Sequence, residues 1–452
     1  MSNTRRDFLK KLALGSAGIT VSSLSRGFSS RSYANILGSN DRVRVGIVGF
    51  SDRAKYSLIP AFQAFSNNLN FDIVAVSDIW KRRRDEGLDY FKKEYDKSVE
   101  TARNNEELYE NFNLDAVIIS TADFQHALHT IDAVEAGCDV YVEKPFAETM
   151  EDNRKALKAV ESSDRIVQIG TQRRSGANYM AAKEYIDSGK FGNITIVEMT
   201  WNVNQPGRWR RPNLVKDLNE RDTDWKRYLI NRPYEDWHPR KYIEYRLFWP
   251  YSSGIPGQWM THQIDTVHWF SGLKHPRSVV ANGGIYMWND GRKNWDTMTA
   301  VFDYGPDSKP EQGFQVVYSS RMHNSAGGVK ELYFSNGGTL NLLTNKVTPG
   351  GGLTEGFASA MNMKEFLLGE YTLPTTQVET AANTGSDPMT TAHMLNWMEC
   401  VSSRKKPNAD IHAGYEHAIA NIMTTAAIRT GQRATFDEKR QEVISGDDIF
   451  KY

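Results

Sequence analysis

The chain has 452 residues, of which 40% are hydrophobic and 11% aromatic. It can therefore bury ordinary cores, and its length predicts two or three domains. Lysines and arginines together number 55, as do aspartates and glutamates, so the formal net charge is zero. A chain without bulk positive charge lacks the field that holds a nucleic-acid backbone, so the expected partner is a small molecule and no nucleic acid.

The amino terminus predicts an export signal. Arg5 and Arg6 are followed by Phe8-Leu9-Lys10 and then by a mildly apolar stretch, 12–24, rich in glycine, alanine and serine. This is the layout of a twin-arginine signal, which we place at residues 1–34 and which predicts export to the periplasm in the folded state. The apolar stretch is too short for a stable membrane anchor. The alternative is an amphipathic surface helix.

The cysteine and histidine content gives no sign of a metal centre. Cys138 and Cys400 are the only cysteines. Cys138 lies in a segment that predicts a turn after a helix, and Cys400 lies in a predicted helix. Neither a disulfide framework nor a thiolate site is expected from two such residues. His126 and His129 have a spacing that can mimic a metal pair, but they lack further ligands. We therefore expect no metal.

Residues 43–142 alternate short β-branched runs with helical stretches. The predicted strands are 43–48, 73–77, 116–120 and 140–142. Apolar runs of this kind are buried on both faces, which is typical of a parallel, doubly wound α/β sheet. Pro60 lies where the first crossover helix should run and predicts a late start or a kink in that helix.

Beyond Pro145 the pattern changes to that of an α+β domain with a large, mainly antiparallel open sheet. Strands are predicted at 166–170, 194–201, 278–287, 297–304 and 313–320, and helices near 150–162, 176–188, 393–402 and 414–430. The glycine-rich stretch 349–387 lacks clear periodicity and predicts a loop or lid, with partial helix near 359–368.

A nucleotide-binding fingerprint follows the first strand. Gly49, Ser51 and Ala54 occupy the G-x-G-x-x-G/A positions, with serine at the second. Small residues there let the backbone approach a pyrophosphate at a helix N-terminus. The second strand ends in Asp78, whose carboxylate would bind the adenosine ribose and repel a 2′-phosphate, which favours NAD over NADP. The basic run 81–84 includes side chains that could bind a phosphate, although a solvated helix face is the favoured interpretation.

Three further stretches complete a recognisable set. They are Ile119-Ser120-Thr121-Ala122-Asp123-Phe124-Gln125-His126, Tyr141-Val142-Glu143-Lys144-Pro145 and Gln168-Ile169-Gly170-Thr171-Gln172-Arg173-Arg174. Together they resemble the glucose-fructose oxidoreductase/inositol dehydrogenase/MocA (Gfo/Idh/MocA) family, and the similarity covers essentially everything after residue 41. The Glu-Lys-Pro motif is its most specific mark.

The resemblance implies a Rossmann domain for NAD at residues 41–165 and a domain for substrate binding and oligomerisation at residues 166–452. It implies that Lys144 lies beside the nicotinamide and the substrate hydroxyl, and that Pro145 follows a cis bond. A cation there would stabilise a developing alkoxide. The implied cofactor-binding residues are Gly49, Phe50, Ser51, Arg53, Ala54, Asp78, Ser120, Thr121, His126, Glu143 and Lys144.

A second constellation, 254–269, resembles the family motif that carries the catalytic histidine. His262 matches that histidine, a general acid/base on the hydroxyl being oxidised. Asp265 shares its helical face, so its carboxylate could orient the helix or the ring. Many family members carry aspartate where this chain has Gln258, which cannot take a proton. The candidate catalytic residues are therefore Lys144, His262, Gln258 and Asp265, and the alternative for His262 is a packed helix histidine.

Seven of the eleven tryptophans lie between Trp201 and Trp269, interleaved with arginines. Aromatic faces stack on sugar rings and guanidinium groups bind hydroxyls or carboxylates, so this segment predicts a carbohydrate site. The candidate substrate-binding residues are Arg173, Trp209, Arg246 and His262. A core or subunit interface is an equally weighted alternative.

The leading hypothesis is an exported NAD(P)-dependent oxidoreductase that acts on a secondary hydroxyl of a sugar, polyol or sugar derivative. One alternative is a glycosidase that oxidises its substrate transiently with NAD and works by elimination. Another is a non-catalytic sugar-binding protein. Because free NAD is scarce outside the cytoplasm, we expect a tightly held cofactor, and the resemblance implies a homodimer or homotetramer.

Overall fold

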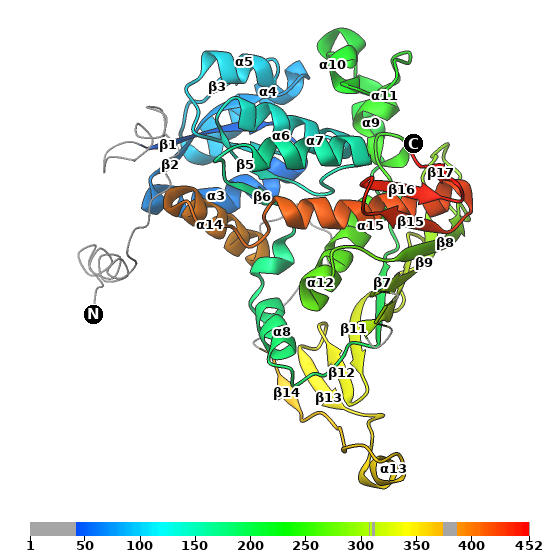
Figure 1. Ribbon diagram of the computed structural model, residues 1–452. Helices are drawn as coiled ribbons and strands as arrows, with labels where there is room; N and C mark the ends of the chain where they lie inside the picture. Colours follow the sequence, from blue (N-terminus) through cyan, green and yellow to red (C-terminus); the bar gives the residue numbers. More distant parts are fainter. Residues whose placement is uncertain (1–41, 307, 310–311, 374–386, 452) are drawn as a thin grey trace, which may run out of the picture. The chain divides into compact units, whose positions relative to one another are not determined.

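The computed structural model describes residues 42–306, 308–309, 312–373 and 387–451 (Figure 1). The predicted twin-arginine signal at residues 1–34 lies outside these residues. Within them, no helix is both long and apolar enough to cross a membrane.

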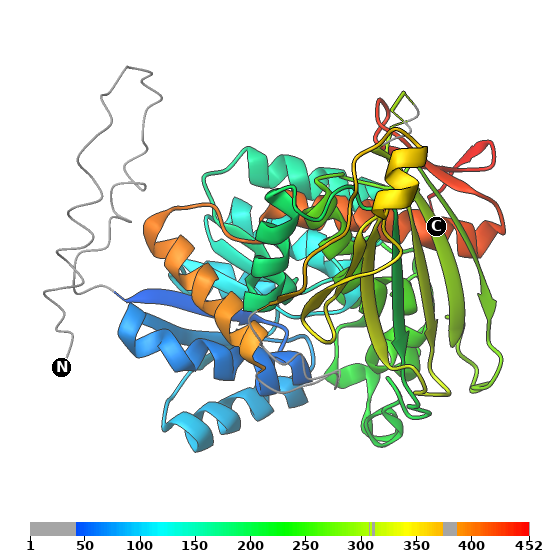
Figure 2. The ribbon, with the colours of Figure 1, turned by 90° about the horizontal axis from the view of Figure 1, so that it is seen from below.

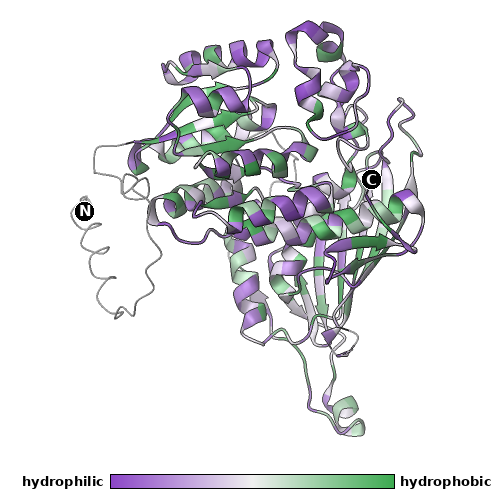
Figure 3. Cartoon of the chain, turned by 45° about the horizontal axis from the view of Figure 1, so that its top comes forward, coloured by the Kyte–Doolittle hydropathy of each residue, from purple (hydrophilic) through white to green (hydrophobic). Residues whose placement is uncertain are grey.

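The first layer of the fold is a six-stranded, fully parallel sheet with the strand order β3-β2-β1-β4-β5-β6. This is the doubly wound order, and it confirms the predicted α/β fold class. Its strands are largely buried, and Figure 3 shows that they are mostly hydrophobic. The strands are β1 (Val43–Val48), β2 (Phe71–Ser77), β3 (Glu100–Ala102), β4 (Ala116–Ile119), β5 (Asp139–Val142) and β6 (Val167–Ile169). The sheet thus extends past the predicted domain boundary at residue 165.

Helices flank this sheet in the expected alternation. They are α4 (Lys81–Tyr95), α5 (Asn105–Asn111), α6 (His126–Glu135) and α7 (Met150–Glu161). The first crossover begins with a π-helical turn, Ala54–Leu58, and continues as α3 (Ile59–Leu69) with Pro60 in its first turn. A proline lacks the N–H that an interior helical turn needs, so the regular helix starts late, as predicted.

The second layer is an eleven-stranded sheet in the order β14-β13-β12-β11-β7-β10-β9-β8-β15-β16-β17. All neighbouring strands are antiparallel except β7 and β10. The predicted α+β class and mainly antiparallel sheet are therefore confirmed. Its strands are β7 (Ile196–Asn202), β8 (Ser278–Gly284), β9 (Thr297–Tyr304), β10 (Phe314–Arg321), β11 (Val329–Ser335), β12 (Gly338–Asn341), β13 (Lys346–Pro349), β14 (Tyr371–Thr372), β15 (Ala434–Asp437), β16 (Glu442–Ser445) and β17 (Asp448–Ile449).

Helices α12 (Thr261–Ser271) and α15 (Ile411–Thr430) pack on one face of this sheet, and α8 (Ala177–Asp187) packs on α12 (Figures 1 and 2). Burial alternates along β9 and β10, so one face of these strands is buried and the other is partly exposed. The remaining helical segments connect these layers. They are Asp123–Gln125, Gln172–Ser175, α9 (Pro212–Asp217), Glu220–Asp222, α10 (Trp225–Leu229), α11 (Pro239–Ile243), Tyr245–Leu247 and the π-helical turn Pro256–Met260.

The predicted loop at 349–387 contains short regular elements. A helix, α13 (Glu355–Ala360), precedes the predicted partial helix at 359–368, because Asn362 adopts a left-handed conformation with φ 51° and ends the helical course early. The strand β14 lies in the same stretch, and residues 374–386 of it are outside the described residues.

The helix α14 (Pro388–Ser403) returns from the rear of the sequence to cover the parallel sheet. Its Trp397 is fully buried, with its ring centroid 6.3 Å from that of Phe71 and 5.9 Å from that of Tyr141. The Rossmann layer is therefore completed by residues far downstream in the sequence. The predicted range of the Rossmann domain, residues 41–165, does not include them.

A carboxyl group is buried where the loop after β5 meets the second domain. Glu148 is 2% exposed, and its Oε1 accepts hydrogen bonds from the backbone N–H and from Oγ of Ser253, both at 3.1 Å. Burial, reinforced by the negative charge of Asp123, raises the pKa of Glu148 from 4.5 to about 8. The folded protein therefore keeps a proton on this group at neutral pH.

This burial predicts a pH-dependent difference between the wild type and Glu148→Gln. Between pH 5 and 8 the unfolded chain has lost the Glu148 proton while the folded chain retains it, so this group makes the wild type less stable as pH rises. The glutamine of the variant cannot ionise. The free energy of unfolding of the variant should therefore rise relative to that of the wild type by at most about 1.4 kcal/mol for each pH unit. Urea unfolding at a series of pH values measures this gain. The exposed Glu135→Gln is the control, and a Glu148→Gln difference that does not change with pH would contradict the prediction.

Candidate active site

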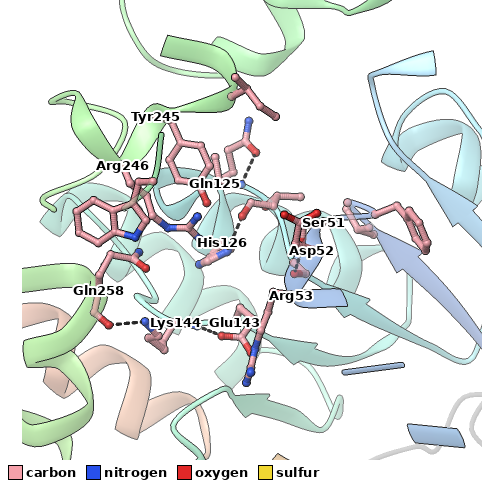
Figure 4. Close-up of a pocket in the computed structure, with 18 of the residues that line it drawn as sticks. Ser51, Asp52, Arg53, Gln125, His126, Glu143, Lys144, Tyr245, Arg246 and Gln258 are labelled. Carbon is pink, nitrogen blue, oxygen red and sulfur yellow. Dashed lines mark hydrogen bonds and ion pairs between the residues drawn. The ribbon is translucent and has the colours of Figure 1, made fainter. Parts of the chain in front are cut away.

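A cavity of about 680 Å³ opens at the carboxyl ends of β1, β2, β4 and β5 and is closed on its other side by segments of the second domain (Figure 4). In doubly wound sheets this edge is where ligands bind. The cavity brings together nearly all the predicted site residues: Gly49, Phe50, Ser51, Arg53, Asp78, Ser120, Thr121, His126, Glu143, Lys144, Arg173, Trp209, Arg246, Gln258 and His262. Ala54 and Asp265 do not line it.

The loop after β1 is built for close approach of a ligand to the backbone. Gly49 has φ +86°, and a Cβ there would lie 2.9 Å from the carbonyl oxygen of Ser120 and 2.9 Å from Cγ2 of Thr121. Only glycine fits this position. Ser51, which stands at the second fingerprint position, bonds through Oγ to Oγ of Ser120 at 2.6 Å and accepts from the N–H of Ala54 at 3.2 Å. Ala54 thus stabilises the loop through its backbone N–H, without lining the cavity.

Asp78, the acid that follows β2, connects the loop after β1 with the loop after β2. Oδ2 of Asp78 accepts a hydrogen bond from the N–H of Phe50 at 2.9 Å, and Oδ1 accepts from the N–H of Trp80 at 2.9 Å. Burial raises the pKa of Asp78 above its ordinary value, although these N–H groups oppose the shift. Each carboxylate oxygen retains a lone pair for a ribose hydroxyl.

The basic run that follows Asp78 is held by acidic partners. Lys81 pairs with Asp85, Arg82 with Glu86, and Arg83 with both Asp52 and Glu86. These pairs are those of a charged helix face, which supports the favoured interpretation of this run. Of the four side chains only Arg83 lines the cavity.

The strand end at β5 carries an ion pair beside Lys144. Nε of Arg53 lies 2.8 Å from Oε1 of Glu143, and a Cβ on Gly170 would come within 3.1 Å of that carboxylate. His126 links the neighbouring loops, with Nδ1 2.7 Å from the carbonyl oxygen of Pro145 and Nε2 3.3 Å from that of Thr121. Burial lowers the pKa of His126, and the neutral ring can donate a hydrogen bond to only one of these two carbonyls.

Lys144 points into the cavity toward the second domain (Figure 4). The Lys144–Pro145 peptide bond is cis, as the resemblance implied. Nζ of Lys144 donates a hydrogen bond to the carbonyl oxygen of Gln258 at 2.5 Å. Burial lowers the pKa of Lys144 to about 8, although the charges of Glu143 and Asp123 oppose the shift. The amine can therefore exchange its proton near neutral pH.

The side chain of Gln258 turns to an acid that sequence reasoning missed. Nε2 of Gln258 donates to Oδ2 of Asp123 at 2.6 Å, and Oγ of Ser252 donates to the same oxygen at 2.6 Å. Asp123 is fully buried on a short turn after β4, and Nε of Arg246 lies 3.8 Å from its Oδ1. The signal for Asp123 was present in the stretch 119–126, where it is the only acid.

His262 presents a neutral imidazole to the cavity. Its ring stacks on that of Trp201, with centroids 5.8 Å apart and planes at 27°. Burial, with the charges of Lys144 and Arg173, holds the pKa of His262 well below its ordinary value. Within the described part of the chain, no residue hydrogen-bonds to either ring nitrogen of His262, so both can serve a ligand.

Asp265 does not face the same way as His262. Its carboxylate forms a bidentate pair with Arg174, at 2.8 and 3.0 Å, and lies 3.8 Å from His417. Although burial alone would raise it, the pKa of Asp265 is lowered because of Arg174 and His417. The prediction that Asp265 is a catalytic candidate therefore needs correction: this residue anchors α12 from behind the cavity.

Aromatic rings form one wall of the cavity beside Gln258. The rings of Trp201 and Trp259 are parallel within 7° at 6.2 Å, and that of Trp209 lies 5.4 Å from Trp259. Arg173 lines the same wall but is already paired with Glu331 and packed against Trp201. Sequence reasoning placed Trp201, Trp259 and Arg208 in the predicted carbohydrate segment but chose only Trp209 and Arg246 from it as substrate-binding candidates, and it did not name Tyr245.

Comparisons with known proteins agree with this geometry. Residues 43–171 match the family described as "Oxidoreductase family, NAD-binding Rossmann fold". Inositol 2-dehydrogenase of Salmonella typhimurium is 28% identical over 168 residues, which are 36% of this chain and 48% of that protein. The chain spans about half the length of the curated relatives it matches.

Solved structures extend the likeness to both domains. The WlbA dehydrogenase from Bordetella pertussis, in complex with NADH and UDP-GlcNAcA, aligns with a TM-score of 0.59 and 18% identity over 88% of this chain and 99% of that chain. Myo-inositol 2-dehydrogenase from Lactobacillus plantarum aligns with a TM-score of 0.59 and 15% identity over 88% of this chain and 100% of that chain. Identities this low show the shared fold alone. Residues 43–171 thus match the model of an NAD-binding Rossmann domain, and the chain that follows continues in a sheet domain with the fold of these solved structures.

Proposed function

We propose that this protein is an NAD-dependent oxidoreductase that acts on a secondary hydroxyl of a sugar, polyol or sugar derivative. The observation that carries this proposal is the meeting of Lys144 and His262 in one cavity with the nucleotide loop at Gly49. A lysine that can change its protonation near neutral pH and a neutral imidazole are the groups that alcohol oxidation needs.

The residues at the carboxyl ends of β1 and β2 fit NAD. The cradle at Gly49, where a Cβ would collide with Ser120 and Thr121, suits a pyrophosphate, and Asp78 suits a ribose diol. The Asp78 carboxylate and the pairing of Arg83 with two acids both favour NAD over NADP. When bound, NAD supplies the hydride acceptor for the alcohol carbon.

The chain's own residues handle the hydroxyl proton. His262 is neutral at physiological pH because its pKa lies well below that range, so its imidazole can accept the proton. Lys144, as a cation held by the carbonyl of Gln258, stabilises the developing alkoxide. The side-chain amide of Gln258 is not a base and takes no proton, and its Nε2 donates a hydrogen bond to Asp123.

Mixing the NAD-loaded protein with free sugars, sugar acids, polyols and their glycosides tests this assignment. Reduced nicotinamide, seen by its near-ultraviolet absorbance, should accumulate with at least one free sugar or polyol. Release of an aglycone without net reduction would instead establish the glycosidase that works by transient oxidation. Binding of a sugar without either product would leave a non-catalytic sugar-binding protein.

The pKa of Lys144 predicts how oxidation depends on pH. Because the cationic amine is the active form, turnover should fall as pH rises through about 8. His262, whose pKa is held well below its ordinary value, should add no limb near neutral pH. Lys144→Met should lower kcat by about a hundredfold or more while the affinity for NAD is retained. The exposed Lys155→Met is the control, and a Lys144→Met variant with wild-type turnover would remove this residue from the chemistry.

We further propose that the protein is exported by the twin-arginine route with its cofactor bound. The support is the Arg5-Arg6 pair, the apolar stretch 12–24 that follows it, and the scarcity of NAD outside the cytoplasm. Protein recovered from the periplasm of its native host should therefore retain NAD through dialysis. Complete loss of nucleotide on dialysis, or recovery from the cytoplasm alone, would argue against this proposal.

The open face of the eleven-stranded sheet is the expected site of self-association. Among the described residues, α12 and α15 pack on the other face, and Val280 on β8 is 38% exposed on this sheet. We propose a homodimer or homotetramer formed through this face, which the mass of the purified assembly in solution would test.

A further inference from the structure

A segment of the second domain crosses the nucleotide end of the cavity. It follows β7, comprises residues 205–245 with α9, α10 and α11, and is called the strap below (Figure 1). Arg227 and Tyr242 of the strap line the cavity together with Trp80 of the parallel-sheet domain. In a doubly wound fold, the loops after the first two strands receive the adenosine half of a dinucleotide. The strap therefore covers the place where adenosine would lie.

The ring of Tyr242 lies close to the acid that suits the adenosine ribose. Its centroid is 6.3 Å from that of Trp80, with the two planes at 90°, and the N–H of Trp80 donates to Asp78 at 2.9 Å. Burial, with the negative charge of Asp78, raises the pKa of Tyr242 well above its ordinary value, so its phenol stays protonated. An aromatic face with a neutral hydroxyl beside Asp78 suits a nucleoside.

The strap contacts each of the four segments that follow β1, β2, β3 and β4. Two of these contacts are polar and have measured lengths. Nη2 of Arg211 lies 3.6 Å from Oδ2 of Asp52, and the carbonyl oxygen of Tyr228 accepts a hydrogen bond from Nε2 of Gln125 at 2.8 Å. The four contacts are Arg211 with Asp52, Tyr242 with Trp80, Arg227 with Glu106 and Tyr228 with Gln125. A dinucleotide in this cavity would therefore be enclosed between the strap and the parallel sheet.

One part of the strap is fixed by buried polar contacts. Nη1 of Arg232 lies 3.2 Å from Oδ2 of Asp152 on α7, and the side chains of this pair are each 1% exposed. Nδ2 of Asn231 donates to the other carboxylate oxygen of Asp152 at 2.7 Å. Breaking a buried pair would leave an uncompensated charge, so this part of the strap stays in place.

The outer edge of the strap is held by exposed ion pairs. Asp217, the last residue of α9, lies 3.3 Å from Arg82, and these side chains are 57% and 44% exposed. Glu106, the partner of Arg227, is 59% exposed. These two pairs are called the rim pairs below. Exposed ion pairs contribute little to stability and weaken with salt, so the edge can open while the buried part stays fixed.

We propose that the strap closes over the adenosine half of NAD and sets the rate at which the cofactor leaves. Tyr242 covers the adenosine, and the rim pairs hold the strap closed. A cover of this kind governs release because the ligand leaves only when the cover opens. This inference rests on NAD as the proposed cofactor and does not require that a sugar is oxidised.

The alternative role of the strap is to join the two domains. The buried contacts of Asp152 and Gln125 with the strap would be enough for that role. Loss of the rim pairs would then leave the release of the cofactor unchanged. The release rate therefore separates the two roles.

Release of NADH from the full-length protein tests the proposal. The protein is loaded with NADH and mixed with an excess of NAD, and the decay of the fluorescence of bound NADH gives the release rate. Raising the ionic strength from about 0.05 M to about 0.5 M should speed release about threefold or more, because salt screens the rim pairs. A release rate that does not change with salt would contradict the proposal.

Variants assign the effect to the strap. The double variant Glu106→Gln/Asp217→Asn, whose two positions do not line the cavity, should release NADH about threefold or more faster at low salt and lose most of the salt dependence. Tyr242→Ala should release it about tenfold faster, whereas Tyr242→Phe, which keeps the ring, should stay close to the wild type. Asp187→Asn is the control for an exposed ion pair, because Asp187 pairs with Lys183 on α8. Wild-type release in both the double variant and Tyr242→Ala would overturn the proposal.

The two halves of the cofactor locate the action of the strap. Adenosine diphosphate ribose lacks the nicotinamide, and nicotinamide mononucleotide lacks the adenosine. Each is loaded in turn and displaced by an excess of NADH, whose fluorescence then rises at the rate of release. The double variant should speed the release of adenosine diphosphate ribose and leave that of nicotinamide mononucleotide unchanged. The opposite result would place the strap over the other half and overturn the proposal.

The failure of this inference differs from the failure of the proposed function. Reduction of NAD by a sugar, with a release rate that no strap variant changes, would keep the oxidoreductase and remove the role of the strap. Release that depends on the strap variants, with no reduction by any sugar, would keep that role and remove the oxidoreductase. A protein that binds neither NADH nor adenosine diphosphate ribose would overturn both.

Discussion

The candidate site depends on a lysine amine buried against a backbone carbonyl. Nζ of Lys144 donates to the carbonyl oxygen of Gln258, and no carboxylate in the described part of the chain forms an ion pair with it. A carbonyl oxygen carries only a partial charge. It therefore accepts the hydrogen bond from the amine without raising the pKa of the amine as much as a paired carboxylate would. The nearest acids, Glu143 and Asp123, are each engaged by another side chain. Burial therefore sets the pKa near 8.

This contact works only if two domains are held in register. Lys144 ends β5 of the parallel sheet, whereas Gln258 lies in the π-helical turn that leads into α12. The buried pair between Asp265 and Arg174 fixes α12 from behind, and Asn421 on α15 donates to Oγ1 of Thr261 at 2.7 Å. Asp265 is thus a positioning residue, and its misassignment to the chemistry came from its helical spacing to His262.

The sequence predicts the elements whose periodicity is strong and the residues whose motif is local. The β-branched strands, Gly49 and Asp78 follow from the order of a βαβ unit, which is read along the chain. Lys144 was identified through the resemblance of its Glu-Lys-Pro motif. The short strands such as β3 and β12 have too few residues for alternation to be seen. The return of α14 to the parallel sheet, and the meeting of Gln258 with Asp123, are contacts between distant segments, which no spacing along the chain encodes.

The exchange of an acid for an amide at position 258 has a consequence for the chemistry. The amide donates to Asp123, so a negative charge stays close to the site but is moved to the parallel-sheet side and buried completely. Asp123 does not line the cavity, and its Oδ2 accepts hydrogen bonds from Gln258 and Ser252. It acts instead through its field on Lys144 and Arg246, whose cationic forms it favours.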